Sequence, residues 1–194
     1  MKVSGKKVAE HRAALVATAK RLLKERGFDG AGVVEISREA GLTQGALYGQ
    51  FKSKDALALE ACREAFADGV AAWRDLRNTM PDPLLAYLDS YLTDVHVQDV
   101  GCGCAMAACG PEVSRQDPAI CAAFAKGFQD MVEMVQCALP ETTPPEAARR
   151  RALALVSAMV GSVAMARAVR ATDPNLSREI IAAAREELEQ FAVR

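Results

Sequence analysis

Hydrophobic residues recur three and four positions apart along most of the chain, which is the spacing of one face of an α-helix. The first apolar stripe lies between residues 6 and 26 and consists of Val8, Leu15, Ala19, Leu22 and Leu23. No segment shows the sustained apolar–polar alternation that is typical of a half-buried strand. Alanine and leucine, which both favour helix, supply much of the apolar content. The pattern therefore predicts an all-α protein.

Glycines, prolines and capping residues divide the pattern into about nine helices. The expected helices span residues 6–26, 32–40, 43–51, 53–77, 83–97, 104–115, 118–139, 144–171 and 177–193. Gly27 is the expected C-cap of the first helix, and Thr43 and Ser53 are expected N-caps. Asp82 and Asp117 each precede a proline at the first helical position, which is a common way to begin a helix.

The last two helices have similar start signals. Thr143 also precedes a proline, and its spacing from Glu146 fits a capping box. Ser177 is expected to begin the final helix. Taken together, the elements predict a three-helix head, residues 1–53, and a six-helix body, residues 54–194.

The two short helices of the head are joined by a turn at Gly41, as in a helix-turn-helix, here expected at Val33–Phe51. A side chain at the turn would force a strained left-handed backbone, which glycine avoids. The apolar positions that would hold the two helices together are Ile36, Ala40, Leu42, Leu47 and Phe51.

The second short helix presents a polar face without a carboxylate. This face consists of Thr43, Gln44, Gly45, Tyr48 and Gln50. Gln44 can pair bidentately with adenine, whereas Thr43 and Tyr48 suit phosphate contacts. Lys54, in the next helix, can reach a flanking phosphate. These residues are the candidate DNA-binding set.

Charge distribution agrees with a nucleic-acid-binding head but does not establish it. Residues 1–60 carry 11 Lys+Arg against 7 Asp+Glu, a balance of +4, and residues 61–194 carry 13 against 18, a balance of −5. The spacing alone also fits a plain three-helix core with a tight turn, because helix-turn-helix geometry occurs in proteins that bind no DNA.

A longer set of residues distinguishes these two readings. The matching features are Glu25-Arg26-Gly27-Phe28, Ile36, Ala40-Gly41-Leu42, Gly45-Ala46-Leu47-Tyr48 and Phe51-Lys52-Ser53-Lys54. With these features, residues 15–60 resemble the N-terminal domain of the TetR/AcrR family of transcriptional regulators. The resemblance implies an all-helical homodimeric repressor whose head binds a palindromic double-stranded DNA operator. It also implies a body that holds a small-molecule inducer of unknown identity.

Two positions of the head depart from the family pattern. Ser37 stands where the family often has alanine, and Gln50 where it often has histidine or tyrosine. The Ser37 change is expected to be harmless if its hydroxyl faces a backbone carbonyl one turn earlier, and the Gln50 change keeps a hydrogen-bonding group. Gly49 weakens a short helix by roughly 1 kcal/mol relative to alanine.

The implied dimer has candidate contact residues in the last two helices. The expected interface residues are Ser157, Gly161, Met165, Ile181 and Leu188. Small residues three and four apart allow helices to approach closely, and symmetry mates would make isologous contacts. The alternative is that these stripes are the core of a monomer.

The implied inducer pocket has candidates on the middle helices. They are Trp73, Tyr87, Tyr91, Met106, Phe124, Phe128, Met131 and Met159. Each of these residues can instead belong to the hydrophobic core without contacting a ligand. The helix at 53–77 is expected to carry the ligand signal to the head.

The cluster of Cys102, Cys104 and Cys109, near His96, allows three interpretations. The thiols can be small buried residues, they can sense oxidants or electrophiles, or they can bind a soft metal with His96. The resemblance includes a Gly-Cys pair at Gly101-Cys102 in one branch of the family. The Cys-x-Cys spacing lacks the Cys-x-x-Cys pair of a structural zinc site, so neither a metal nor a cofactor is expected.

An enzyme and a ligand-free architectural DNA binder are the rival classes. The chain has two histidines, no phosphate-binding glycine loop and no H-E-x-x-H, and only a Cys104–His96 nucleophile pair is conceivable. We therefore expect no enzyme. We also expect no signal peptide, no membrane-spanning segment of about 18 apolar residues and a cytoplasmic location, where the six cysteines are reduced.

Overall fold

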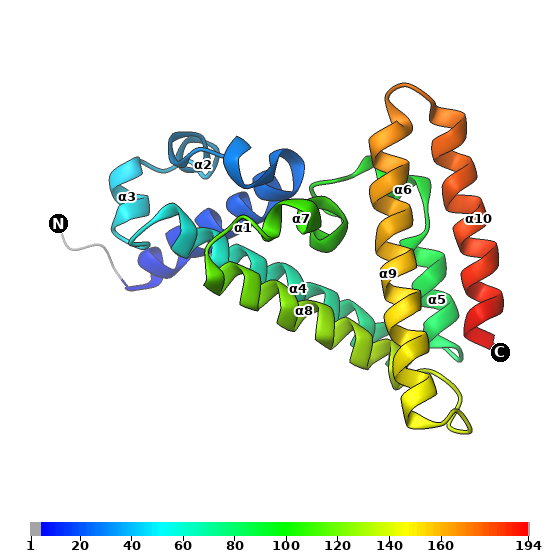
Figure 1. Cartoon of the computed structure of the whole chain (residues 1–194). Helices are drawn as coiled ribbons and strands as arrows, with labels where there is room; N and C mark the ends of the chain where they lie inside the picture. The colour runs from blue at the N-terminus through cyan, green and yellow to red at the C-terminus, as the bar shows by residue number, and fades with distance from the viewer. Residues whose placement is uncertain (1–4, 194) are drawn as a thin grey trace.

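The computed structural model describes residues 5–193, and its regular structure in that range is entirely helical (Figure 1). The helices are α1 (Gly5–Gly30), α2 (Val33–Glu39), α3 (Gln44–Tyr48), α4 (Lys54–Thr79), α5 (Pro83–Tyr91), α6 (Asp94–Gln98), α7 (Ala105–Val113), α8 (Pro118–Gln136), α9 (Pro145–Arg170) and α10 (Pro174–Val193). The prediction of an all-α protein is confirmed.

Helices α1 to α3 form one end of the molecule, and the antiparallel pair α9 and α10 forms the other (Figure 1). Two long helices, α4 and α8, run side by side and connect the two ends. Helix α7 lies between the α1 end and the α9 end and packs against both. Any change inside the body can therefore reach the head through α4 or through α7.

Four of the expected N-caps are confirmed. The side chains of Thr43, Ser53, Asp82 and Asp117 each accept a hydrogen bond from a backbone N–H in the first turn that follows, at 2.8–3.2 Å. These oxygens satisfy backbone donors that have no partner inside the helix. Local sequence therefore sets the start of each of these helices.

The helix expected at residues 83–97 is instead two helices, which makes ten rather than nine in the described range. The chain leaves helical geometry at Leu92 (φ −88°, ψ 70°), and the Thr93 hydroxyl accepts from the His96 N–H at 3.1 Å to begin α6. The β-branched Thr93 loses side-chain freedom inside a helix and is a good cap, so the break is compatible with its chemistry.

Two other expected starts are wrong. Helix α9 begins at Pro145 after Pro144, without a side-chain cap, so Thr143 and Glu146 form no capping box. Helix α10 begins at Pro174, because the Asp173 carboxylate accepts from two N–H groups of the first turn at 2.9 and 3.1 Å. Ser177 is buried one turn inside that helix.

Gly27 interrupts α1 as expected. Its backbone has φ 75° and ψ 177°, a conformation that disfavours any residue with a Cβ. One further turn follows the interruption and ends at Gly30. The interruption turns the N–H of Phe28 away from the helical ladder, toward α7.

Buried apolar residues form two clusters. The first joins α1, α2, α3 and the first two turns of α4. It also contains Cys109, Val113 and Ile120, which come from α7 and α8. The second cluster lies among α4 to α10. The core of the head is therefore completed by the body, and the boundary at residue 53 stays a prediction.

The expectation that no segment could span a membrane is wrong for α9. In the part of the chain that the structure describes, this one helix is long and apolar enough by length and composition. Its apolar residues are alanines, valines, leucines and methionines, interrupted by Ser157, Gly161, Ser162 and Arg167. A core helix passes the same test, and α9 packs against α6, α7, α8 and α10.

Candidate DNA-binding face and ligand pocket

The turn between α2 and α3 has the geometry that its sequence predicts. Gly41 has φ 70°, and the Leu42 N–H donates to the Ser37 carbonyl at 2.8 Å to close the turn. Ile36 and Leu47 are buried between the helices. The two helices are thereby fixed at one relative orientation, which a DNA-reading helix requires.

Four predicted DNA-binding residues lie on the open face of α3. Thr43, Gln44, Gly45 and Tyr48 are exposed, with 57% of the Tyr48 surface accessible. Helix α3 contains no acidic residue, so this face presents hydrogen-bonding groups without repelling phosphate. Gln50 and Lys54 are half-buried just after it. The structure thus brings the six predicted residues to one end of the molecule.

Arg12 holds the end of α3, a role that the sequence did not reveal. Its guanidinium donates to the Gln50 carbonyl at 3.0 Å, lies 4.2 Å from the centroid of the Phe51 ring and pairs with Glu60. Arg12 thereby links α1, the end of α3 and α4. No local pattern signals such a residue, because its partners are 38 to 48 positions away.

The condition under which Ser37 would be harmless is not met. Its hydroxyl is buried and has no hydrogen-bond partner among the described residues. A bond to a carbonyl one turn earlier is absent there. A buried hydroxyl without a partner loses its water and gains nothing in return, so the serine is a cost to stability.

The head is tied to α7 and to the loop before it. The Glu112 carboxylate accepts from the Phe28 N–H at 2.9 Å, beside the Gly27 interruption. The Lys24 ammonium donates to the Gly103 carbonyl at 3.1 Å. Burial lowers the pKa of Lys24, the largest of several influences on this group. Helix α7 and the loop before it are therefore bonded directly to α1.

A cavity of about 380 Å³, the inner pocket, opens beside these contacts. Its wall is formed by Lys24, Ala65, Phe66, Asp68, Gly69, Ala72, Tyr87, Ser90, Tyr91, His96, Cys102, Gly103, Cys104, Ala105, Met106, Gly127, Met131 and Met134. The lining is mostly apolar with a few polar groups, as is typical of small-molecule sites. The Tyr91 hydroxyl is buried and has no partner with hydrogen-bond geometry in the described chain.

The predicted pocket residues fall in different places. Tyr87, Tyr91, Met106 and Met131 line the inner pocket. Met159 is fully buried in the body core. Of the others, Trp73 lines a neighbouring shallow hollow, Phe124 packs edge-on against Phe66 with ring centroids 5.4 Å apart, and Phe128 packs on the body core.

Lys24 and Phe66 were missed as pocket residues. Lys24 belongs to the head in sequence, and it reaches the pocket only because the fold brings α1 against the 99–104 loop. Phe66 lies on the connecting helix and looks like ordinary core.

His96 is held as a neutral ring. Its Nδ1 lies 2.6 Å from the Tyr91 carbonyl, and its Nε2 accepts from the Cys104 N–H at 2.8 Å. Only a ring protonated on Nδ1 alone satisfies both contacts. Burial lowers the pKa of His96, and Arg167 and Lys24 act in the same direction. With both ring nitrogens occupied, His96 is not free to activate Cys104, so the conceivable nucleophile pair is not formed.

The three clustered cysteines differ in environment. Cys102 is exposed and Cys104 is half-buried at the start of α7, and both line the inner pocket. Cys109 is buried, and burial raises its pKa to about 12. It is therefore a thiol at neutral pH, and the thiolate needed for sensing is not accessible there. Within residues 5–193, no three His, Cys, Asp or Glu side chains are grouped so as to hold a metal ion.

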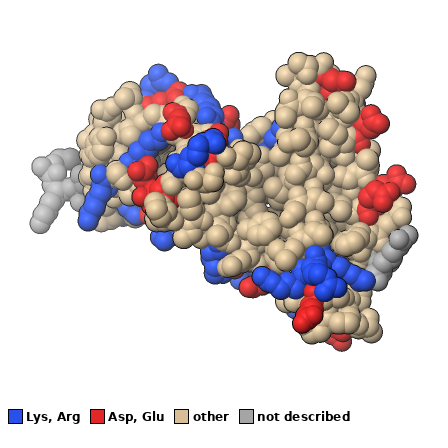
Figure 2. Space-filling model, in the orientation of Figure 1, with Lys and Arg blue, Asp and Glu red and all other residues tan. Residues whose placement is uncertain are grey.

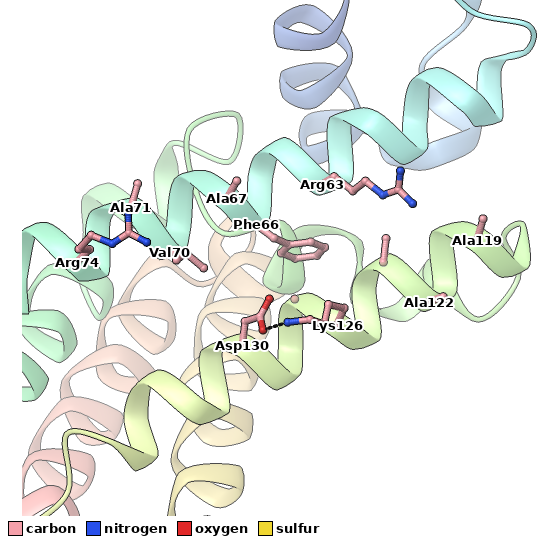
Figure 3. Close-up of a pocket in the computed structure, with 12 residues that line it drawn as sticks. Arg63, Phe66, Ala67, Val70, Ala71, Arg74, Ala119, Ala122, Lys126 and Asp130 are labelled. Carbon is pink, nitrogen blue, oxygen red and sulfur yellow. Dashed lines mark hydrogen bonds and ion pairs between the residues drawn. The ribbon is translucent and has the colours of Figure 1, made fainter.

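A second hollow, the outer groove, lies between α4 and α8 and has a volume of about 760 Å³ (Figure 3). Arg63, Phe66 and Arg74 line it from α4, and Lys126 pairs with Asp130 on α8. Figure 3 shows Phe66 pointing from α4 toward α8, between the two arginines. Phe66 and Gly127 belong to the walls of both the outer groove and the inner pocket.

The predicted dimer residues are divided between surface and core. Ser157 is exposed, Gly161 is half-buried and Met165 is 57% exposed. Ile181 is buried within the chain, and Leu188 packs against the same core. Above the basic group at the lower end of the α9 and α10 side, the visible surface is mostly uncharged (Figure 2). The exposed or half-buried residues of α9 at successive turns are Ala154, Ala158, Gly161, Met165 and Ala168.

Comparison with known proteins adds to this geometry. Residues 15–61 match the family model described as bacterial regulatory proteins, tetR family. Residues 82–177 match the model of the LmrA/YxaF-like transcriptional regulator C-terminal domain. Over 53 residues the chain is 42% identical to YerO of Bacillus subtilis (strain 168), described as an uncharacterized HTH-type transcriptional regulator. That match covers 27% of this chain and 18% of YerO.

Solved structures share the whole fold. The reduced form of E. coli NemR has a TM-score of 0.79 at 23% identity, covering 93% of this chain and 95% of that one. A TetR transcriptional regulator from Legionella pneumophila has a TM-score of 0.80 at 18% identity, covering 99% and 100%. At these identities the likeness concerns the fold.

Proposed function

Because the chain belongs to the TetR family of bacterial regulatory proteins, we propose that it is a ligand-responsive transcriptional repressor in the cytoplasm. A homodimer binds a palindromic operator through two α3 helices and leaves it when a small molecule occupies the inner pocket. The observation that carries the proposal is the open, carboxylate-free face of α3 on a head that is bonded to α7, whose first turn lines the pocket.

In the proposed complex, the residues of α3 have distinct tasks. Gln44 reads a base edge in the major groove, and Gly45 leaves room for the helix backbone to approach. Thr43, Tyr48 and Lys54 contact phosphates and set the register of the head. Gln50 is restricted by the bond between its carbonyl and Arg12, so its side chain acts at the rim of the contact.

The second copy covers the apolar stripe of α9. Ala154, Ala158, Met165 and Ala168 repeat at intervals of three, four and seven residues and leave an apolar strip uncovered by the chain itself. Alanines and Gly161 allow a symmetry-related α9 to approach closely. Ile181 then supports α9 from inside rather than touching the partner.

Ligand release follows two mechanical routes. Helix α4 begins beside the head at Lys54 and lines the inner pocket with Phe66 and Gly69. Helix α7 lines the pocket near Cys104 and holds the Phe28 N–H through Glu112. A ligand that displaces either helix changes the position of the head, and two heads that lose their spacing bind a palindrome more weakly.

The test is operator binding by fluorescence anisotropy, with DNA from upstream of the protein's own coding sequence. Gln44→Ala and Tyr48→Ala should each weaken binding about tenfold, because one good contact contributes about 1–3 kcal/mol. The matched control is Gln190→Ala, which removes an exposed amide from α10 at the other end of the molecule. Equal losses for Gln44→Ala and Gln190→Ala, or no sequence preference in the parent, would contradict the proposal.

A second candidate for the release signal is a thiol-reactive electrophile. Cys102 and Cys104 line the inner pocket, where Cys102 is exposed and Cys104 is half-buried, so a small electrophile can reach both sulfur atoms. The thiolate would add to the carbon–carbon double bond of a Michael acceptor, forming one S–C bond while the neighbouring carbon takes up a proton. No oxidant is consumed. The similar structure of E. coli NemR is described as a reduced form, so the redox state was specified for that protein.

N-ethylmaleimide distinguishes the two signals. In this second case the reagent should release DNA from the parent protein and not from Cys102→Ser/Cys104→Ser. Cys137→Ser is the control, because Cys137 is exposed at the far end of α8. If the double variant and Cys137→Ser lose DNA as readily as the parent, the electrophile hypothesis is wrong and the reversible ligand remains.

A further inference from the structure

We propose that the release ligand is an elongated amphipathic anion of the fatty-acid class. Its carboxylate lies in the outer groove between α4 and α8, and its apolar tail passes the Phe66 ring into the inner pocket. Only the role as release ligand rests on the proposed function. The binding site itself consists of the two hollows, the Phe66 ring between them and the charged side chains around them.

The Phe66 ring is the partition between the two hollows. It lines both, and so does Gly127 on the opposite helix. A Cβ at Gly127 would lie 2.4 Å from the Phe66 Cγ, so the ring lies directly against the backbone of α8. Its other neighbour, Phe124, makes an edge contact with centroids 5.4 Å apart. In the proposed binding mode, rotation of this one side chain joins the outer groove to the inner pocket.

Two arginines flank the partition without partners of their own. Arg63 precedes Phe66 by three residues and Arg74 follows it by eight, which separates them from the ring by ~4.5 Å and ~12 Å along α4. Neither forms a hydrogen bond or ion pair with another described residue, whereas Lys126 is paired with Asp130. A free guanidinium beside an apolar groove binds a carboxylate well, because its donors match the two oxygens.

The walls suit a flexible chain. Small residues line the outer groove on both helices, namely Ala67, Ala71, Ala119, Ala122 and Ala123. Beyond Phe66, the inner pocket offers Met106, Met131 and Met134, whose unbranched thioethers adapt to an irregular apolar guest. Alanine-lined walls with an adaptable, methionine-rich end suit a polymethylene tail. An amphipathic cation would meet Arg63 and Arg74 at the entrance.

Laurate, below its micellar concentration, is the probe for charge. Trp73, the single tryptophan, makes an edge contact at 5.4 Å with Tyr87 of the inner pocket, so its fluorescence reports tail entry. Laurate should bind saturably and dodecyltrimethylammonium at least about tenfold more weakly. Arg63→Gln/Arg74→Gln should lose about tenfold in laurate affinity.

The matched control is Arg77→Gln/Arg149→Gln, which removes two exposed arginines outside the outer groove. It should bind laurate like the parent. Equal losses in the two double variants, or equal binding of laurate and the cationic probe, would overturn the proposal, since either result removes the role of the flanking arginines.

Kinetics test the partition. Phe66→Leu shortens the side chain and should increase the association rate constant of laurate several-fold in stopped-flow fluorescence. Phe124→Leu is the control, because it removes the same ring contact without lining either hollow. A rate unchanged by Phe66→Leu, or raised equally by Phe124→Leu, would show that the ring does not gate entry. Thermal melts of both variants identify any general loss of packing.

These measurements need no DNA, so the two proposals can fail separately. Operator binding with no laurate binding leaves the repressor and rejects the fatty-acid class. Laurate binding that depends on Arg63 and Arg74, in a protein that does not bind its operator, supports the site and rejects the repressor.

Discussion

Two serines of the head show how the same hydroxyl can oppose or support the fold. The Ser53 hydroxyl accepts the Ala56 N–H at 3.1 Å and begins α4. The Ser37 hydroxyl is buried beside the turn of the helix-turn-helix without a partner in the described residues. The difference lies in the hydrogen-bond partners within range of each hydroxyl, and the residue type alone does not reveal these partners.

Ser37→Ala is therefore expected to stabilise the protein by about 1 kcal/mol, because it removes a buried hydroxyl that has lost its water. Ser53→Ala should destabilise it by about 1 kcal/mol through the loss of the helix cap. Urea unfolding followed by circular dichroism gives both free energies. A destabilised Ser37→Ala protein would mean that the hydroxyl has a partner that these contacts do not include.

At the scale of elements, the segment from Leu92 to Cys104 depends on His96. The neutral ring joins the end of α5 to the start of α7 through its two nitrogens. Burial holds the pKa of His96 below its usual value of 6.5, so the unfolded chain takes up this proton at a higher pH than the folded one.

Stability should therefore decline as the pH falls through 6.5, and this contribution should be constant above about pH 7.5. His96→Gln, which cannot be protonated, should show a smaller decline over the same interval even if it is less stable throughout. Urea midpoints at pH 7.5 and 5.5 for both proteins measure the difference. Parallel declines would exclude His96 as the source.

The bond from Phe28 to Glu112 is the second element-scale test. Glu112→Ala leaves the Phe28 N–H buried without an acceptor and should cost about 1–3 kcal/mol. Glu112→Gln keeps an acceptor oxygen and should recover most of that loss. Operator affinity should follow the same order if α7 positions the head. Equal stability of the alanine and glutamine variants would show that the carboxylate acts in another way.

The sequence predicted those elements whose ends are set locally. Thr43 and Asp117 cap through atoms two or three residues away, and both starts were predicted. The break at Leu92 also has a local cap, Thr93, but the apolar periodicity continues across it, so the two helices were predicted as one. The open face of α3 follows from local spacing, whereas Arg12, Lys24 and Phe66 enter the sites through contacts with distant segments.

At the scale of the whole molecule, the proposed repressor requires a dimer, and α9 is its proposed interface. Met165, 57% exposed on the apolar stripe of α9, is the natural place to disrupt a dimer. Met165→Arg should give a monomer by light scattering and lose most operator affinity. Ala125→Arg, on an exposed position of α8, is the matched control and should remain dimeric. A monomeric parent, or a dimeric Met165→Arg protein, would show that α9 is not the interface.

The cluster that buries Cys109, Val113 and Ile120 with the head has a consequence for how such proteins can be recombined. Residues 5–53 cannot be moved to another protein with their core intact, because α7 and α8 supply three of its side chains. A chimera that places this head on a foreign body would expose apolar surface unless the new α7 supplied equivalent side chains. Under the proposed function, operator specificity is therefore more readily changed by substituting the outer face of α3 than by exchanging heads.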